Sequence, residues 1–452
     1  MKAFHLMISR GITLLMCGLT ITATAQDYTL EEAITAAQTN DPWQKSSRFK
    51  QQSLEAQSIS EASLPDPQIS FGLANAPIDS FDLNQEPMTQ MVVGIQQVLP
   101  RGDTLALRQK HFKRLGDIQP YDRENRLAEV YAIVSALWLD AYRSARTIGF
   151  IKRDRNLFEH LVDVAESNYT SGSGSARQNN VIRAQLELTR LDDRLLQLQQ
   201  MLDVNLAQLA LWLPAEDVGI DLPPSVALQL DLKAVIQSGH KGPNSQLIHQ
   251  VLQSHPRVKS IDKAIEAQTI QVDLANQSYK PQWKLNSQFG WRQDDPMGNS
   301  RSDFLSIGVG VDLPVFTKNR QDKQVLAATA RTSAMKSNRA LVLRALLSDF
   351  EAAEAQYKRL KQRQKLFAFR LLSAMDEQVE TSLTAYTNDE GEFSDVVRAR
   401  ISQLNAKIEA LNIHVDLQKQ IVNINYFVSG YLKKNINNQM STLLYSNGAA
   451  NE

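Results

Sequence analysis

The chain has 452 residues, carries 49 basic and 49 acidic side chains, and is 43% hydrophobic. This balance argues against a nucleic-acid-binding protein, which would need a basic stripe, and the length allows two or three domains. Cys17 is the one cysteine of the sequence, so we expect no disulfide bond.

The N-terminus has the pattern of a secretory signal peptide. Lys2 and Arg10 are followed by the apolar run 12–21 and a small-x-small cleavage site. We therefore predict a signal peptide over 1–25 and an exported protein. The residue before Cys17 is not the small one that a lipoprotein signal requires, so we expect no lipid anchor. Later stretches fall short of the ~20 consecutive apolar residues of a membrane helix.

The first structural repeat is predicted over 26–213. The sequence Thr29-Leu30-Glu31-Glu32 is a capping box, which predicts a helix start there, and Pro42 interrupts that helix. A hairpin follows, because apolar and polar residues alternate over two segments. Its predicted strands are 67–74 and 90–99.

A very long helix is predicted after this hairpin, over about 102–169, with one interruption at Pro120. At ~1.5 Å per residue it would reach about 100 Å, so it needs partners along its length. The Gly/Ser-rich turn 170–175 reverses the chain, and a leucine-striped helix returns to about residue 213. Residues 214–244 contain Pro-Pro and Gly-Pro steps and are predicted to be a linker.

The second hairpin has the clearest strand pattern, with predicted strands 281–291 and 303–313. Trp283, Leu285, Phe289 and Trp291 alternate with polar or small residues. The two tryptophans are about 26 Å apart along an extended strand. This pattern is typical of an outer-membrane β-barrel with aromatic girdles at both interfaces. A half-buried hairpin of a soluble sandwich is the alternative that the hairpin alone leaves open.

The order of elements occurs twice in the chain. Three prolines of the first half, at 42, 67 and 100, recur 214 positions later, and the helix, hairpin, long helix, turn and helix recur with them. Near the turns, 180–184 aligns with 395–399 at an offset of 215. We predict a second structural repeat over 245–434 and a disordered tail over 435–452.

The number of strands has a consequence for assembly. A chain with four membrane strands cannot close a spanning sheet, yet an open edge in lipid leaves backbone groups without partners. The smallest bacterial barrels have ~8 strands, so at least two chains must combine their strands. Cyclic symmetry is the natural way to close such a ring.

This duplicated helix-hairpin-helix-turn-helix plan resembles the TolC-type outer-membrane efflux proteins over nearly the whole predicted mature chain. The resemblance implies a mainly α-helical protein with a membrane β-barrel. It implies a homotrimer with a twelve-stranded barrel in outer-membrane lipid, continued by a long α-helical periplasmic tunnel. A periplasmic membrane-fusion adaptor and an inner-membrane RND pump are the implied partners. The tips that would meet the adaptor contain Tyr169, Gly172, Tyr386 and Gly391.

The resemblance also implies a constriction at the periplasmic end, formed in the family by acidic residues just after the second turn. Asp395 matches the first of these positions, whereas Arg398 occupies the second. Asn180 and Arg183 take the equivalent places on the first repeat. Our hypothesis is that Asp395 and the arginines form a closing ion-pair network. The alternative is an ordinary surface pair on an exposed helix.

The segments 75–88 and 97–102 resemble the heavy-metal branch of the family, which implies export of metal cations. Drug efflux or type I protein secretion are the alternatives for cargo. A periplasmic coiled-coil scaffold is the alternative from another class.

Enzymatic activity is not expected, because no catalytic arrangement is legible in the sequence, and no cofactor is expected either. The spacings of His240, His249 and His255 suit no common metal site, so we predict no bound metal. Met88 and Met91 are most simply explained as packing residues.

Overall fold

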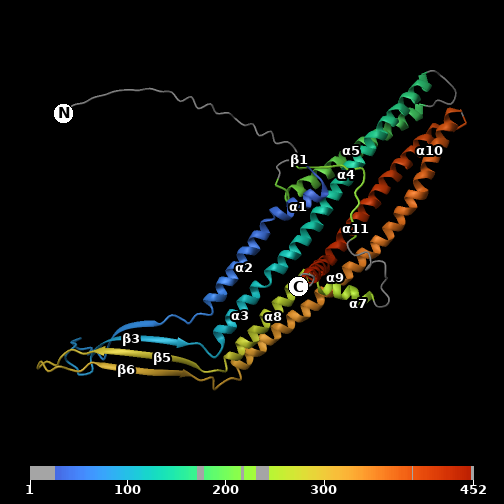
Figure 1. The fold of residues 1–452 in the computed structure, drawn as a ribbon. Coiled ribbons are helices and arrows are strands. Elements are labelled where there is room, and N and C mark those ends of the chain that lie inside the picture. The colour runs from blue at the N-terminus through green and yellow to red at the C-terminus, as the bar shows by residue number, and fades with distance from the viewer. Residues whose placement is uncertain (1–25, 171–177, 215–217, 231–243, 389, 449–452) are drawn as a thin grey trace, which may run out of the picture.

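The structure, a computed structural model, describes residues 26–170, 178–214, 218–230, 244–388 and 390–448. The molecule is long and narrow: a small sheet lies at one end, and two helical hairpins end together at the other (Figure 1). The helices of the first half are α1 (Leu30–Asn40), α2 (Pro42–Ser60), α3 (Thr104–Gly116), α4 (Gln119–Thr170) and α5 (Gln178–Ala210).

The second half repeats this plan. Its helices are α7 (Asn244–Gln253), α8 (Pro256–Gln277), α9 (Gln321–Leu366), the π-helical turn η1 (Phe367–Leu371), α10 (Leu372–Thr387) and α11 (Phe393–Gly448). The strands are β1 (Gln26–Tyr28), β2 (Gln68–Ala74), β3 (Gln90–Leu99), β4 (Val218–Ile220), β5 (Gln282–Trp291) and β6 (Phe304–Asp312). The four hairpin strands begin and end within one residue of the bounds that alternation predicts.

Local sequence explains where these helices start. The Thr29 side chain accepts a hydrogen bond from the backbone N–H of Glu32, whose carboxylate accepts from the Thr29 N–H, which completes the capping box. Asp41 caps α2 and His255 caps α8, each followed by a proline, which suits the first helical turn because it needs no N–H there. The predicted break near Pro120 lies between α3 and α4.

The side-by-side order of elements is the same at three levels along the molecule. The antiparallel sheet has the order β2-β3-β5-β6. Next to it the helices contact one another in the order α2-α3-α8-α9, and toward the tips in the order α5-α4-α11-α10. Thus β2, α2 and α5 form one open side of the molecule, and β6, α9 and α10 form the other.

Three apolar clusters hold the helices together along their length. One surrounds the stacked rings of Trp138 and Tyr142, and a second contains Phe350 and Phe427. The third contains Phe158 and Phe393 and lies toward the tips. A narrow helical molecule therefore has a series of small cores in place of one large core.

The predicted linker is partly a structural element. Its residues 218–220 form β4, which pairs in parallel with β1. The following segment 221–230, here called the strap, runs across α4 and α11, where Tyr142 donates a hydrogen bond to Pro223 (3.0 Å) and Asn425 donates one to Gln229 (2.9 Å). Val226 and Leu230 of the strap are buried. Its apolar residues have partners on the helices, which the proline content of the segment did not reveal.

The C-terminus also differs from the expectation. Helix α11 continues to Gly448, so most of the segment 435–452 that was predicted to be disordered is helical. Its polar composition argues against burial but does not prevent a helix, because 435–447 contains neither glycine nor proline. Among the described residues, no helix is both long and apolar enough to cross a membrane.

Candidate functional site

One face of the sheet is apolar and exposed. Its side chains are 41% to 79% exposed. Strand pairing places them in continuous cross-strand rows, such as Phe71-Val93-Phe289-Leu305. Monomeric soluble proteins rarely expose such a patch, so this face needs an apolar environment. The face comprises Ile69, Phe71, Leu73, Met91, Val93, Ile95, Trp283, Leu285, Phe289, Trp291, Leu305, Ile307, Val309 and Val311.

The opposite face of the same sheet is small and polar. One cross-strand row contains Ser70, Gly94, Gln288 and Ser306. The next row toward the helices has Gln68, Gln96, Asn286 and Gly308 in register. Such a face suits water. The sheet therefore separates an apolar side from an aqueous side.

The two tryptophans predicted as an aromatic girdle lie on the apolar face, at the two ends of β5. Trp283 pairs with Leu99 and Val311, and Trp291 pairs with Met91. Their side chains are 46% and 43% exposed. Two indole rings at opposite borders of an apolar band have the arrangement of girdle residues.

Two arginines fasten the long loop of the first hairpin to the second hairpin. Arg292 donates a hydrogen bond to the Pro87 carbonyl (3.0 Å), and its guanidinium lies over the Phe304 ring, 4.0 Å from the centroid. Arg301 donates to the carbonyls of Asn84 and Glu86, both at 3.2 Å. Sequence reasoning missed both contacts, since they join segments more than 200 positions apart.

The sheet joins the helices through residues just after β3. Arg101 donates to the carbonyls of Ser278 (3.2 Å) and Lys280 (2.9 Å) and pairs with Asp312. Gly102 has φ +46°, and a Cβ there would lie 2.2 Å from Lys280 Cδ. The positive φ favours glycine at this position, whereas the Lys280 side chain is flexible and could move away from a Cβ. The segment 97–102, which carries part of the family resemblance, thus joins the two repeats.

An aromatic pair and a tight turn shape the end of the described tip. The rings of Tyr386 and Phe393 pack edge to face, 5.7 Å apart. The Glu390 N–H donates to the Ala385 carbonyl (2.9 Å), and a Cβ on Gly391 would lie 3.0 Å from the Ala385 Cβ. Tyr386 and Gly391 therefore shape the second turn. In the other tip, Tyr169 belongs to the last turn of α4; its side chain and Gly172 lie outside the described residues.

The predicted constriction residues lie at similar levels on α5 and α11, but within one chain they are paired only on α11 among the described residues. Asp395 and Arg398 form an ion pair at 3.2 Å with side chains 55% and 72% exposed. On the neighbouring repeat, Arg183 is exposed and Asn180 is half-buried. Arg194 of α5 donates a hydrogen bond to Asn405 of α11 at 2.8 Å, so residues 211 positions apart lie at the same level on these two helices. Arg183 is therefore level with position 394 of α11. Among the described residues, no hydrogen bond or ion pair joins Arg183 to Asp395 or Arg398.

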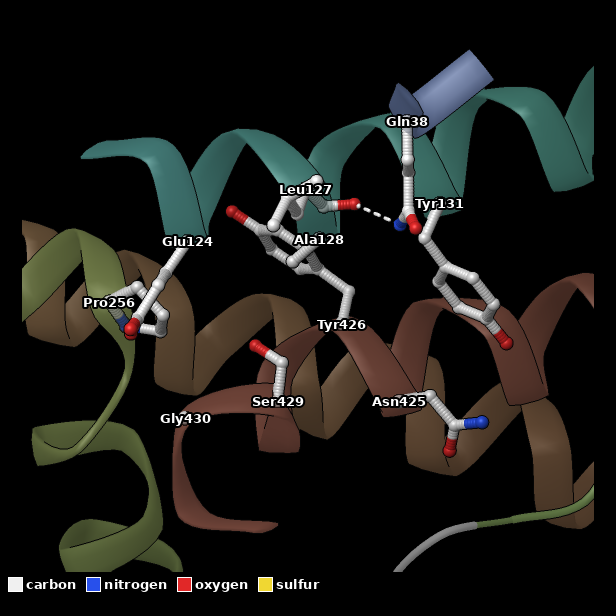
Figure 2. Close-up of a pocket in the computed structure, with 10 residues that line it drawn as sticks. All are labelled: Gln38, Glu124, Leu127, Ala128, Tyr131, Pro256, Asn425, Tyr426, Ser429 and Gly430. Carbon is white, nitrogen blue, oxygen red and sulfur yellow. Dashed lines mark hydrogen bonds between the residues drawn. The ribbon is translucent and has the colours of Figure 1, made fainter. Parts of the chain in front are cut away.

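A pocket of about 290 Å³ lies between α4 and α11, beside the start of α8. Figure 2 shows the Tyr426 ring beside Leu127 and Ala128, and the Gln38 amide directed at the Leu127 carbonyl, 2.9 Å away. Its polar side chains are mostly neutral, apart from Glu124. The pocket has the character of a packing defect where helices diverge.

His255 lies close to this pocket, fully buried with its ring 4.9 Å from the Tyr426 ring centroid. Burial lowers the pKa of His255 to about 4, so the imidazole is neutral. His249 is exposed, and His240 lies outside the described residues. In the part of the chain that the structure describes, no group of three or more His, Cys, Asp or Glu side chains is placed to hold a metal ion.

A second pocket, of about 430 Å³, lies between α4 and α11 beneath Pro224 of the strap. Arg153 and Lys407 line it together with Asp154. Burial raises the pKa of Asp154, and the positive charges of Lys407, Arg400 and Arg153 oppose that shift. Of these charged residues, Asp154 is buried, Lys407 is half-buried and Arg153 is exposed, so one buried carboxyl group lies among more accessible positive charges of α4 and α11.

Comparison with known proteins identifies the fold. No protein-family model and no curated protein matches the chain. Solved structures do match. The outer membrane protein VceC from Vibrio cholerae is 14% identical, with a TM-score of 0.70 over 88% of this chain and 96% of that chain. The outer membrane channel CmeC of Campylobacter jejuni is 15% identical, with a TM-score of 0.69 over 89% and 85%.

A third match is CusC, a protein that folds to form a transmembrane channel. It is 14% identical, with a TM-score of 0.70 over 89% of this chain and 92% of that chain. At these identities the likeness is one of fold. The predicted mainly helical TolC-type fold is confirmed at that level.

Proposed function

We propose that this protein is the outer-membrane channel component of a tripartite RND-type efflux system, a passive duct that spans the outer membrane and extends into the periplasm. The observation that carries the proposal is the exposed apolar face of the sheet, backed by a polar face, within a fold shared with outer membrane channels. An apolar face of this kind is stable against lipid, while the polar face lines water.

The working unit is a homotrimer. The sheet of one chain has open edges at β2 and β6, and the helical layers below it are open on the same two sides. One rotation therefore closes all three levels at once. Three copies give a twelve-stranded barrel and a continuous helical wall below it.

Selective closure belongs at the tips. In a trimer, Asp395, Arg398, Asn180 and Arg183 form a ring of groups at one level near the end of the helices. The exposed pair of a single chain becomes a network when copies face one another, and its strength depends on how much water it excludes. The tip residues Tyr169, Gly172, Tyr386 and Gly391 contact the periplasmic adaptor, which links the duct to the inner-membrane pump.

Single-channel conductance in planar bilayers tests this closure. Asp395→Ala and Arg398→Ala channels should conduct more than the unmodified channel at the same voltage. Lys323→Ala, on an exposed stretch of α9 far from the tips, is the control. Unchanged conductance in both tip variants would remove these residues from the constriction.

Heavy-metal cations are the cargo that we favour, because 75–88 and 97–102 resemble the metal-exporting branch. Drug efflux or type I protein secretion is the second candidate, since a fold shared at similar TM-scores with several outer membrane channels does not distinguish one cargo from another. A periplasmic scaffold whose hairpins pack on a soluble partner is the least favoured function, because an apolar face with Trp283 and Trp291 at its borders is typical of a sheet that faces lipid.

Survival of a deletion strain, with and without the gene, tests both parts of the proposal. It is scored across copper, silver, zinc, cadmium and a set of hydrophobic drugs, alongside membrane fractionation. Metal sensitivity with outer-membrane location supports the favoured cargo, and drug sensitivity replaces it with the second. Recovery of the protein in the soluble periplasmic fraction would reject the duct.

A further inference from the structure

The helix α5 has two apolar sides, and within the described part of the chain one of them is covered. The covered side carries Ala184, Leu191 and Leu209 and contacts mainly α4, with further contacts to α11 and β4. A second stripe, at helical spacing, points away from the bundle and is 47% to 82% exposed. An amphipathic helix with a second uncovered apolar stripe is built for a further contact. The stripe consists of Ile182, Leu186, Leu196 and Val204, with Met201 beside it, and it continues in Leu211 just after the helix ends.

The opposite open side of the molecule carries an exposed aromatic residue of its own. Phe369 lies in the π-helical turn η1, between α9 and α10, and is 80% exposed; Leu366, one turn before it, is 52% exposed. A π-turn widens the helix locally, and such turns are frequent at functional positions. Phe369 is the more exposed of these two apolar side chains, and the charged residues Lys365 and Arg370 lie beside them in the sequence.

We propose that Phe369 of one copy packs against the second apolar stripe of α5 in the next copy, between Leu196 and Met201, as the main apolar contact of the helical wall. This inference rests on the cyclic homotrimer of the proposed function. The common order of elements at the three levels makes α10 and α5 the helices that meet when the ring closes.

The axial heights agree with this pairing. Gln403 on α11 donates to Asp376 on α10 at 2.6 Å, and Arg194 on α5 donates to Asn405 on α11 at 2.8 Å. Since α10 and α11 are antiparallel, position 405 of α11, and with it Arg194 of α5, lies level with position 374 of α10. Phe369 is five residues farther from the tip than position 374, so it is level with position 199 of α5. Rotation about an axis along the helices does not change height, so the match carries over to the neighbouring copy.

The charges on either side of this contact are complementary. The same comparison of levels along the helices places Lys365 level with Asp203 of α5, and Glu377 level with position 191, next to Arg190. These four side chains belong to exposed residues. Opposite charges on both sides of a central aromatic group favour one register of the two helices over a slipped one. A second copy of this chain is thus the occupant that both the apolar and the charged residues fit.

Cysteine cross-linking of the full-length protein tests the contact. The native cysteine lies in the predicted signal peptide, so Phe369→Cys with Gln200→Cys provides a defined thiol pair. Because α5 and α10 lie at opposite sides of one chain, a short thiol cross-linker can join the pair only between copies. We expect species of two and three linked chains on a denaturing gel. Phe369→Cys with Leu186→Cys is the control, since these heights differ by about 20 Å at ~1.5 Å per residue.

The outcomes separate this inference from the proposed function. If native mass shows a trimer but the first pair links no more than the control, the contact is wrong and the duct proposal stands. If native mass shows a monomer in lipid nanodiscs, both fail.

A charge exchange provides a second test that does not alter Phe369. Lys365→Glu and Asp203→Lys should each lower the detergent-resistant trimer fraction severalfold, and the double variant should restore it. Equal losses in the single and double variants would overturn the register.

Discussion

The two ends of the molecule are held in different ways. At the sheet end, every strand is bonded to a neighbour along its length, and Arg101 ties both repeats to the helices below. At the described tip, α10 and α11 meet through side chains: the Tyr386–Phe393 ring pair, buried valines such as Val379 and Val396, and the Gln403–Asp376 hydrogen bond. An end held by contacts between side chains opens at a lower free energy than a continuous hydrogen-bonded sheet. A duct with a fixed mouth in the membrane and a movable periplasmic end would need this difference.

The largest effect should come from Phe393→Ala at the tip. The Phe393 ring is buried and lies against Tyr386, and its loss should destabilise the tip by ~3–5 kcal/mol. Hydrogen exchange should accelerate over 384–400 while the sheet stays protected. Tyr386→Phe, which keeps the ring, is the control. Equal acceleration at both ends would show that the tip is not an independent unit.

At the sheet end, the loss of stability caused by a charged substitution should depend on which face of the sheet carries it. Phe289→Lys places a charge on the apolar face and should destabilise the proposed barrel in lipid by ~2–4 kcal/mol. Gln288→Lys, its neighbour on the polar face, should have little effect. Urea titration in lipid vesicles measures both. If the two variants lose the same stability, the assignment of faces is wrong.

Acidification should lower the free energy of unfolding of the helical part between the two ends, because His255 is buried there as a neutral ring. Its pKa is about 4 when folded and about 6.5 when unfolded, so the unfolded chain binds more protons between these values. Stability from the neutral, buried ring is complete above pH 6.5 and is lost as the pH falls toward 4. The expected loss from pH 7.5 to pH 5.5 is about 1.3 kcal/mol per chain. His255→Asn, which can still cap α8, should remove this part of the pH dependence, as followed by thermal unfolding.

The smallest effect should come from the exposed pair near the tip. Asp395→Asn should cost less than ~0.5 kcal/mol of stability, because an exposed i,i+3 pair contributes little. Denaturant unfolding of the monomeric, detergent-solubilised chain measures it. A loss of stability several times larger would mean that the Asp395–Arg398 pair is already shielded from water in a single chain. The conductance change would then have to be separated from unfolding of the tip.

Sequence periodicity was enough to predict the four hairpin strands and most of the helices, because the hairpins alternate with period two and prolines mark several helix starts. The β1–β4 pair and the helical end of α11 were not predicted. Side-by-side order could not be predicted, since it depends on contacts between segments such as Arg101 and Ser278. The strap was missed because its buried residues, such as Val226, are isolated among prolines. In the structure of one chain, the predicted constriction residues form only an exposed ion pair, because their other partners would come from other copies of the chain.

The π-turn has a consequence for the history of the two repeats. A turn of this kind contains one residue more than the α-helical turn it replaces, and it lets the helix on both sides keep its phase. The second half of the chain can therefore carry an inserted residue within η1 without rotating α10 away from α11. Deleting Ala368 should leave both flanking helices aligned, whereas deletion of a residue in the middle of α9 should turn one flank by ~100°. The duplicated halves have diverged in length here without losing their common architecture.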